Sequence, residues 1–268
     1  MTNSEHSPVA HLICPEAYPH AVQQIHLRET HISWVFLTGE FVYKVKKPVD
    51  FGFVNFSTLD RRKHFCEEEL RRNRILAGDL YLEVVPISRG PGGKLLVGSS
   101  LDIVDYAVKM HQFDEAELVS QMLTSGTLSQ ADVDELARKV AANHRGAERA
   151  IDNDWGTPEL VRTPALDNIA VLRPLISSPE RQTQLDQLEQ WTLKRLDDFS
   201  SFFSQRKTKG FVRECHGDLH LGNIVRWRGR MIPFDCIEFN PGFYWIDVMN
   251  EVAFLVMDLD DHQRSDLG

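Results

Sequence analysis

One polar segment constrains this chain more than any other feature of its sequence. The run Cys215–Asn223, CHGDLHLGN, sets two histidines, an aspartate and an asparagine between apolar stretches. The runs on either side of Arg228-Gly229-Arg230 are typical of a hairpin, and Asp235 ends the second of them. Because a hairpin returns the chain to its starting point, we expect Asp235 to lie beside Asn223.

The chemistry that suits this set of side chains is phosphoryl transfer. That reaction needs one carboxylate to orient an attacking hydroxyl and accept its proton, and a second carboxylate with an amide oxygen to hold Mg²⁺ on the phosphates. The alternative is a polar turn between strands with a capping aspartate. The predicted hairpin directly after the motif favours a site over a turn.

The same residues resemble the catalytic loop and metal-binding segment of the aminoglycoside phosphotransferase family, relatives of the protein kinases, with His-Gly-Asp in place of His-Arg-Asp. The resemblance implies that Asp218 is the catalytic base, that Asn223 and Asp235 bind Mg²⁺, and that His216 is a structural hydrogen-bonding residue. Asp247 resembles a later family aspartate that braces the catalytic loop, and it also fits a helix N-cap. ATP is the phosphoryl donor that the resemblance implies.

A kinase-like site also needs a lysine on a strand that reaches the phosphates. In Phe41–Lys46, FVYKVK, an alternation of period two places Lys44 and Lys46 on one face beside Val42. The segment is similar to the kinase Val-Ala-Ile-Lys pattern, which favours Lys44 and leaves Lys46 as the alternative. A solvated charge on an edge strand is the plainer interpretation of a single lysine.

A glutamate on the following helix should hold that lysine. The run 59–76 has apolar residues near helical spacing, and its acidic candidates are Glu67, Glu68 and Glu69. Glu69 is preferred, because its spacing of seven from Leu76 resembles the family's glutamate-to-leucine pattern and keeps both residues on one helix face. An acidic patch that balances the neighbouring arginines is the alternative.

Two further segments give weaker indications of nucleotide contacts. The strand-like runs from Ile32 to Lys46, on either side of Thr38-Gly39-Glu40, predict an N-terminal hairpin. No glycine-rich loop precedes it; Glu29–Ser33 occupies that place, where related phosphotransferases use a short loop with a serine, so Ser33 is a candidate phosphate contact. An ordinary strand bend is the alternative for this segment. Asp105–Met110 falls where the family has its interlobe hinge, which implies that its backbone receives adenine.

The order of the predicted elements indicates an α+β fold. Strand-like runs separated by one helix fill the chain as far as His111, and helical patterns dominate after it. We therefore expect a protein-kinase-like fold of two lobes, a β-rich ATP-binding lobe over 1–111 and a mainly helical catalytic lobe over 112–268. Ligands often bind where two such lobes meet.

Composition narrows the class of protein. Of the 268 residues, 39 are acidic and 30 basic, a net charge of −9 that disfavours a broad nucleic-acid-binding face. The four cysteines lack metal-type spacing and a secretory context, and no apolar run is long enough for a membrane span. We expect a cytoplasmic protein with reduced thiols that binds neither nucleic acid nor membranes.

Two segments resemble the N-terminal half of a bacterial two-part protein in which a phosphotransferase-like domain precedes a P-loop domain. They are VYKVKKPVDFGFVNFSTLDRR and FCEEELRRNRIL. No P-loop motif occurs here, so the resemblance implies a P-loop domain as a partner in a longer protein. The sequence ends soon after Asp247, where relatives continue with more helices, so we expect the helical lobe to be incomplete at its C-terminus. The expected function is transfer of the γ-phosphoryl of ATP to a hydroxyl of a small molecule. A nucleotide-binding regulatory module is the first alternative. A protein kinase is the second, disfavoured because no Ala-Pro-Glu follows Asp235.

Overall fold

The computed structural model describes residues 9–268, which form two compact units. Among the described residues, the first unit comprises 9–139 together with 218–240, so the motif from Asp218 onward folds with the N-terminal β-rich part. Residues 140–217 and 241–266 form the second unit. The predicted boundary between two lobes near His111 stays a prediction.

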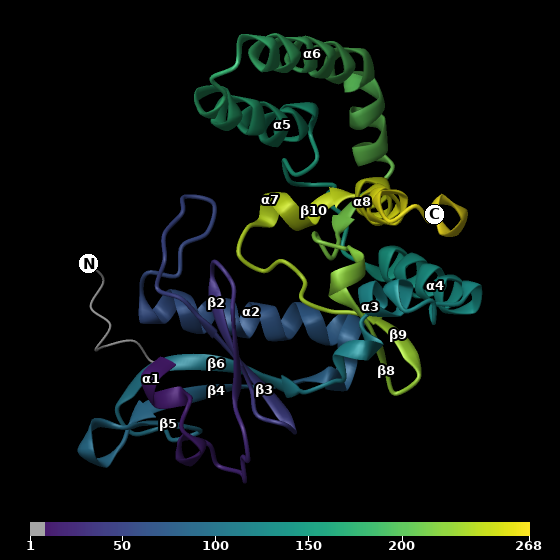
Figure 1. Cartoon of the computed structure of the whole chain (residues 1–268). Coiled ribbons are helices and arrows are strands. Elements are labelled where there is room, and N and C mark those ends of the chain that lie inside the picture. The colour runs from purple at the N-terminus through teal and green to yellow at the C-terminus, as the bar shows by residue number, and fades with distance from the viewer. Residues whose placement is uncertain (1–8) are drawn as a thin grey trace. The chain divides into compact units, whose positions relative to one another are not determined.

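The first unit is built on a six-stranded antiparallel sheet in the order β1-β2-β3-β6-β4-β5, against which α2 packs (Figure 1). Its strands are β1 (His26–Glu29), β2 (Ser33–Leu37), β3 (Phe41–Lys46), β4 (Tyr81–Arg89), β5 (Leu95–Val97) and β6 (Ile103–His111). Its helices are α1 (Val9–Leu12), α2 (Leu59–Ala77) and α3 (Val119–Thr124), and the hairpin of β8 (Ile224–Trp227) and β9 (Arg230–Pro233) completes it. Short 3-10 turns occupy Pro15–Ala17, Gly78–Leu80, Pro91–Gly93, Glu115–Glu117 and Leu221–Asn223.

The second unit is mainly helical. It contains α5 (Pro158–Leu172), α6 (Pro179–Thr208), α7 (Pro241–Tyr244) and α8 (Val248–Asp261), and it shares α4 (Gln130–Gly146) with the first unit. Its two short strands, β7 (Val212–Glu214) and β10 (Trp245–Asp247), pair antiparallel, and 3-10 turns occupy Arg173–Leu175 and Ser265–Leu267. The predicted α+β fold class is confirmed, with a curled sheet followed by a helical region.

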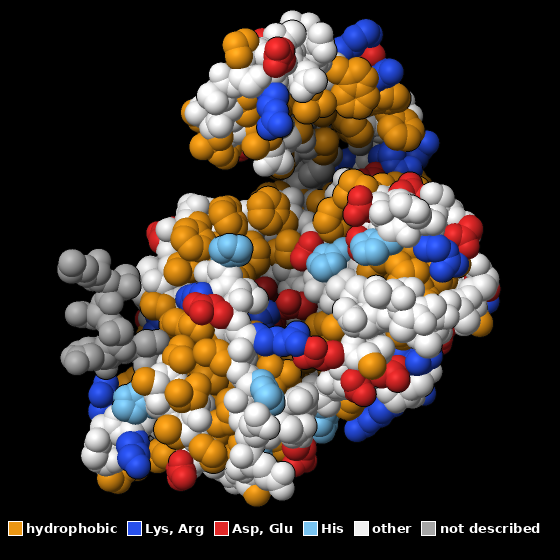
Figure 2. Space-filling view, in the orientation of Figure 1, with side chains coloured by type: hydrophobic (Ala, Val, Ile, Leu, Met, Phe, Trp, Pro, Cys, Tyr) orange, Lys and Arg blue, Asp and Glu red, His pale blue; other side chains and the backbone are white. Residues whose placement is uncertain are grey.

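Helices α5 and α6 pack on one another and leave large apolar side chains at the surface. Trp191 is 58% exposed and Phe202 50% exposed, and hydrophobic side chains cover much of this helical pair in Figure 2. Among residues 9–268, no helix combines the length and the apolar character that crossing a bilayer requires.

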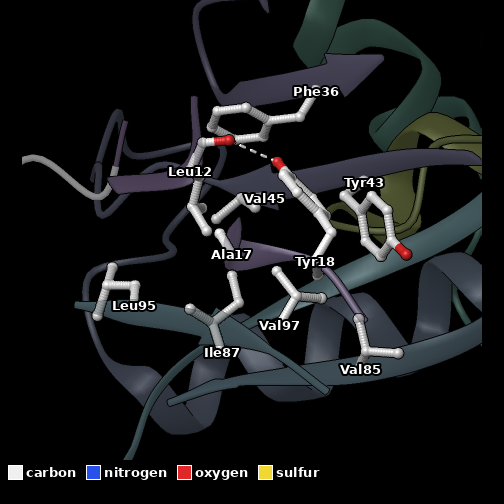
Figure 3. Close-up of a cluster of buried hydrophobic side chains, with 11 residues drawn as sticks. Leu12, Ala17, Tyr18, Phe36, Tyr43, Val45, Val85, Ile87, Leu95 and Val97 are labelled. Carbon is white, nitrogen blue, oxygen red and sulfur yellow. Dashed lines mark hydrogen bonds between the residues drawn. The ribbon is translucent and has the colours of Figure 1, made fainter. Parts of the chain in front are cut away.

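Two apolar cores hold the first unit together. In the first, residues from α1 and the segment after it pack on one face of the sheet, and the Tyr18 hydroxyl donates to the Leu12 carbonyl at 2.7 Å (Figure 3). The second joins the other face to α2 and to the hairpin through Val225 and Ile232, which are 0% and 5% exposed. This second core fixes the hairpin against the strand that carries the two lysines.

Candidate active site

Two lysines of β3 reach one glutamate of α2. Lys44 Nζ lies 3.0 Å from Glu69 Oε1, and Lys46 Nζ lies 2.7 Å from Glu69 Oε2. Both lysines face the helix because residues two apart on a strand share a face. The other two acidic candidates point elsewhere, Glu67 toward Lys63 and Glu68 toward Arg71. Glu69 is therefore the helix partner of both lysines.

The two lysines differ in their second partner. Lys44 also pairs with Asp235, whereas Lys46 also pairs with Glu238. Burial lowers the pKa of Lys44, but Asp235 and Glu69 raise it more, so its pKa lies well above the ordinary value. Burial raises the pKa of Glu238, although Lys46 opposes that shift. Lys44 is consequently cationic at neutral pH.

The two lysines also differ in how far their side chains are exposed to solvent. The side chain of Lys44 is 14% exposed and Asp235 is 40% exposed, so this pair borders solvent. Lys46 is 1% exposed between Glu69 and Glu238, at 0% and 4%. Of the two, Lys44 is positioned to meet a ligand, while Lys46 lies inside a buried ion-pair cluster.

The hairpin β8–β9 brings the candidate metal ligands together, as the sequence predicts. Ile224 pairs with Pro233, and the Phe234 N–H donates to the Asn223 carbonyl at 2.9 Å. Asp235 follows directly with a positive φ of 63°, a conformation that few residues other than glycine adopt and that is typical of functional sites. The backbone of Asp235 is held by the Tyr81 hydroxyl, which accepts its N–H at 3.2 Å.

Asp218 and Asn223 contact each other across the loop. The Asn223 amide nitrogen donates to the Asp218 carbonyl at 3.0 Å and to Asp218 Oδ2 at 3.1 Å. These bonds turn the Asn223 amide oxygen away from Asp218. His220, which the sequence analysis did not single out, has Nε2 3.7 Å from Asp218 Oδ2 and accepts the Gly222 N–H on Nδ1.

These oxygens suit Mg²⁺, which prefers carboxylate and carbonyl ligands and retains several waters. The Asn223 amide oxygen and the partly exposed Asp235 carboxylate would hold the ion, and the cation would replace Lys44 as the partner of Asp235. Another set of possible ligand atoms, on His144, Cys215 and Glu251, lies within 4.8 Å in the buried interior of the second unit. Both Glu251 oxygens there already accept hydrogen bonds.

A buried glutamate of α8 braces the loop just before Asp218. Glu251 Oε2 accepts the Gly217 N–H at 3.0 Å, and Glu251 Oε1 pairs with His144 Nε2 at 2.8 Å. Gly217 has a φ of +90°, and a Cβ there would lie 2.9 Å from the Phe243 carbonyl, so only glycine fits. His216 is 1% exposed and helps to lower the pKa of Glu251, which agrees with a structural role.

Asp247 makes contacts other than the loop bracing that the family resemblance implies. Its side chain caps α8 by accepting the Met249 N–H at 2.8 Å, which confirms the N-cap alternative. It also forms a bidentate ion pair with Arg206, whose Nη2 lies 2.7 Å from Oδ1. The contact to the backbone before Asp218 comes from Glu251, one helical turn later.

We predict that Glu251→Gln lowers stability in a pH-dependent way. Burial raises the pKa of Glu251, but His144, His216 and the Gly217 N–H lower it below its ordinary 4.5. The ionised carboxylate thus contributes stability above about pH 4.5, and that contribution is lost as the pH falls through the folded-state pKa. The variant should lose roughly 1–3 kcal/mol at pH 7 and show a smaller further loss between pH 5 and pH 3. Unfolding free energies of the wild type and the variant, measured across this pH range, test the prediction. If the two free energies change in parallel with pH, the prediction is contradicted.

The candidate phosphate-covering segment is a tight turn between β1 and β2. The Thr30 hydroxyl oxygen accepts the Ser33 N–H at 2.9 Å, and the Thr30 N–H donates to the Ser33 carbonyl at 2.9 Å. Ser33 pairs with Lys46 in the sheet and is 0% exposed, and its hydroxyl has no hydrogen-bond partner among residues 9–268. Its contact with phosphate stays a prediction, and the enclosed side chain does not favour it.

The segment expected to be the interlobe hinge lies inside a strand. Asp105–Met110 falls inside β6, where the backbone from Ala107 onward pairs with β3 on one side and β4 on the other, and Asp105 and Tyr106 pair with β4. The doubly paired part of the segment has its backbone groups engaged in the sheet, so it does not favour adenine binding there. The strand ends at His111, and an open pocket of about 450 Å³ follows, lined by Gly39, Gln112, Phe113, Asp114 and Glu115.

No family model matches the chain. Uncharacterized proteins of Mycobacterium tuberculosis and Mycobacterium bovis are each 28% identical to it over 246 residues, which cover 91% of this chain and 47% of theirs. The chain thus spans about half the length of these curated relatives. Among solved structures, a choline/ethanolamine kinase family protein from Mesorhizobium loti aligns with 90% of this chain and 65% of its own, at 11% identity and a TM-score of 0.42.

Proposed function

We propose that this protein is an ATP- and Mg²⁺-dependent phosphotransferase that moves the γ-phosphoryl group of ATP to a hydroxyl of a small molecule. The observation that carries the proposal is the β8–β9 hairpin, which holds Asn223 beside Asp235 while Lys44 pairs with Asp235. A lysine, a carboxylate and an amide oxygen are the groups that phosphoryl transfer requires around its metal and phosphates.

Each residue has a distinct role in this proposal. Lys44, held by Glu69, binds phosphate oxygens, and Asn223 and Asp235 hold Mg²⁺, which neutralises charge on the phosphates when bound. Asp218 Oδ2 is held by the Asn223 amide, and its side chain is 40% exposed, so an acceptor hydroxyl can approach it and deliver its proton. Adenine is assigned to the pocket after β6, at the end of β3 that begins with Phe41.

We expect ATP with Mg²⁺ to stabilise the protein. A ligand that binds only the folded state adds about 2.7 kcal/mol of stability at about one hundred times its Kd. A thermal-shift titration with ATP should therefore raise the Tm when Mg²⁺ is present and raise it much less in EDTA. Asp235→Asn removes a charged metal ligand and should abolish the difference. A Tm that saturating ATP and Mg²⁺ leave unchanged contradicts the nucleotide assignment.

An acceptor screen tests the reaction itself. Hydroxylated metabolites, including amino alcohols, sugars and aminoglycosides, are offered with ATP and Mg²⁺, and ADP release is compared between the wild-type chain and Asp218→Asn. We expect at least one acceptor to raise ADP release in the wild type alone. ATP binding without any such acceptor, in this chain and in a longer form of the protein, would favour the regulatory-module alternative.

A further inference from the structure

The segment that follows Asp235 is attached to α2 by hydrogen bonds. The Cys236 N–H donates to the Asn73 amide oxygen at 3.0 Å. The Arg72 guanidinium donates to the Ile237 carbonyl at 2.6 Å. Both helix side chains are buried, so the loss of either bond would leave an unsatisfied polar group. Helix α2 therefore fixes the backbone next to the candidate metal ligand.

Ion pairs attach the same segment to α2 and to β3. Five side chains form a series of alternating charge in which each bonds the next: Asp235, Lys44, Glu69, Lys46 and Glu238. Asp235 and Glu238 are three residues apart, so the backbone between them closes the series into a ring, which we call the ion-pair ring. Because the ring holds the segment at both of its ends, the segment cannot move away from Glu69 without breaking ion pairs.

The two carboxylates at the ends of the series differ in what they can reach. The Asp235 side chain is 40% exposed, which leaves it open to a cation from solvent. The Glu238 side chain is 4% exposed and is bonded to Lys46, which is 1% exposed. Enclosed groups cannot touch a substrate or a metal ion that binds at the surface, so Glu238 and Lys46 can affect a reaction only through the residues that they hold.

We propose that Lys46 and Glu238 are positioning residues of the phosphotransferase site, which hold Asp235 in the place where it binds Mg²⁺. The inference rests on the proposed function and names residues that set the geometry of its metal site. Mg²⁺ requires near-ideal octahedral geometry, so a small displacement of one ligand lowers its affinity. Residues that hold metal ligands in place typically change metal affinity about 10–100-fold when they are replaced.

The test uses Lys46→Met/Glu238→Gln, which opens the ion-pair ring and keeps side chains of similar size. This double variant removes two opposite charges together, so it leaves no buried charge of that pair without its partner. The control is Arg62→Met, which removes another buried cation of the same unit. Arg62 pairs with Asp105 at 2.8 Å, outside the ion-pair ring, and lies seven residues before Glu69 on α2.

Amide hydrogen exchange measures the attachment with no ligand present. Exchange in a peptide that covers 235–238 should be at least about tenfold faster in the double variant than in the wild type, because local opening there no longer breaks ion pairs at both ends of the segment. The control should match the wild type within about threefold. Glu238→Asp keeps the charge and withdraws the carboxylate by one methylene, so its exchange should fall between the wild type and the double variant.

The Mg²⁺ dependence of the ATP thermal shift measures the consequence for the site. At a fixed ATP concentration, the Mg²⁺ concentration that gives half of the Tm rise should increase about tenfold or more in the double variant and stay within about threefold in Arg62→Met. A merely structural role would lower the starting Tm of both variants and leave this concentration unchanged.

Two results would overturn the inference even where ATP and Mg²⁺ stabilise the wild type. One is exchange over 235–238 that is the same in the double variant and the wild type. The other is a half-saturating Mg²⁺ concentration that stays at the wild-type value or moves equally in Arg62→Met. If ATP and Mg²⁺ leave the Tm of the wild type unchanged, the proposed function itself fails, so the two failures are distinguishable.

Discussion

Asp218→Asn is expected to reduce acceptor-dependent ADP release by a factor on the order of 10²–10⁴, the usual contribution of a positioned general base. Asparagine preserves the size of the side chain and its acceptor oxygen for the Asn223 amide, which bonds Asp218 Oδ2 at 3.1 Å. The amide cannot accept the proton of an attacking hydroxyl. Turnover should therefore fall while ATP and Mg²⁺ still raise the Tm.

The matched control is Asp235→Asn, which makes the same chemical change on the other side of the hairpin. Asp235 is assigned to the metal, so this variant should weaken metal-dependent nucleotide binding and turnover together. Wild-type turnover in Asp218→Asn would contradict the assignment and direct attention to His220, whose Nε2 lies 3.7 Å from Asp218 Oδ2. A loss of ATP binding in Asp218→Asn would instead place Asp218 among the metal ligands.

Most of the sheet and the motif hairpin could be predicted because their signals are local. Alternation, β-branched residues and glycine turns specify β2, β3 and β8–β9, and a helical period specifies α2. Helix α5 could not be predicted from the sequence, because it contains Pro164, a residue that usually argues against a helix. Strands β7 and β10 could not be predicted either, since three-residue strands are too short to show a period.

The site residues that belong to one sequence motif could be predicted. Where tertiary contacts determine which of two similar residues makes a contact, the sequence leaves the choice open. A period of two places Lys44 and Lys46 on the same face, and only burial distinguishes the exposed lysine from the enclosed one. Glu251 lies four residues after Asp247, so the two share a helix face and sequence spacing cannot tell which one reaches the loop. Glu238 lies in an irregular segment, and no periodic rule connects it with Lys46.

Lys46→Met is expected to lower the free energy of unfolding by roughly 3–5 kcal/mol, the usual cost of removing one partner from a buried ion pair. Lys46 Nζ bonds both Glu69 and Glu238, and all three side chains are at most 4% exposed. Without the lysine, Glu238 loses its bonded cation and Glu69 retains only Lys44. Burial makes such uncompensated carboxylates costly.

Lys44→Met is the matched control for Lys46→Met, because it removes a lysine from the same strand and the same face. Lys44 borders solvent with Asp235, and Glu69 keeps Lys46 as its partner, so the loss of stability should be clearly smaller. ATP binding should show the opposite order, with the greater loss in Lys44→Met. Urea unfolding and the ATP thermal shift measure the two quantities separately. Equal destabilisation by both variants would contradict the buried role of Lys46. The double variant Lys46→Met/Glu238→Gln should recover part of the stability that Lys46→Met loses, since it removes both opposite charges of the ion pair.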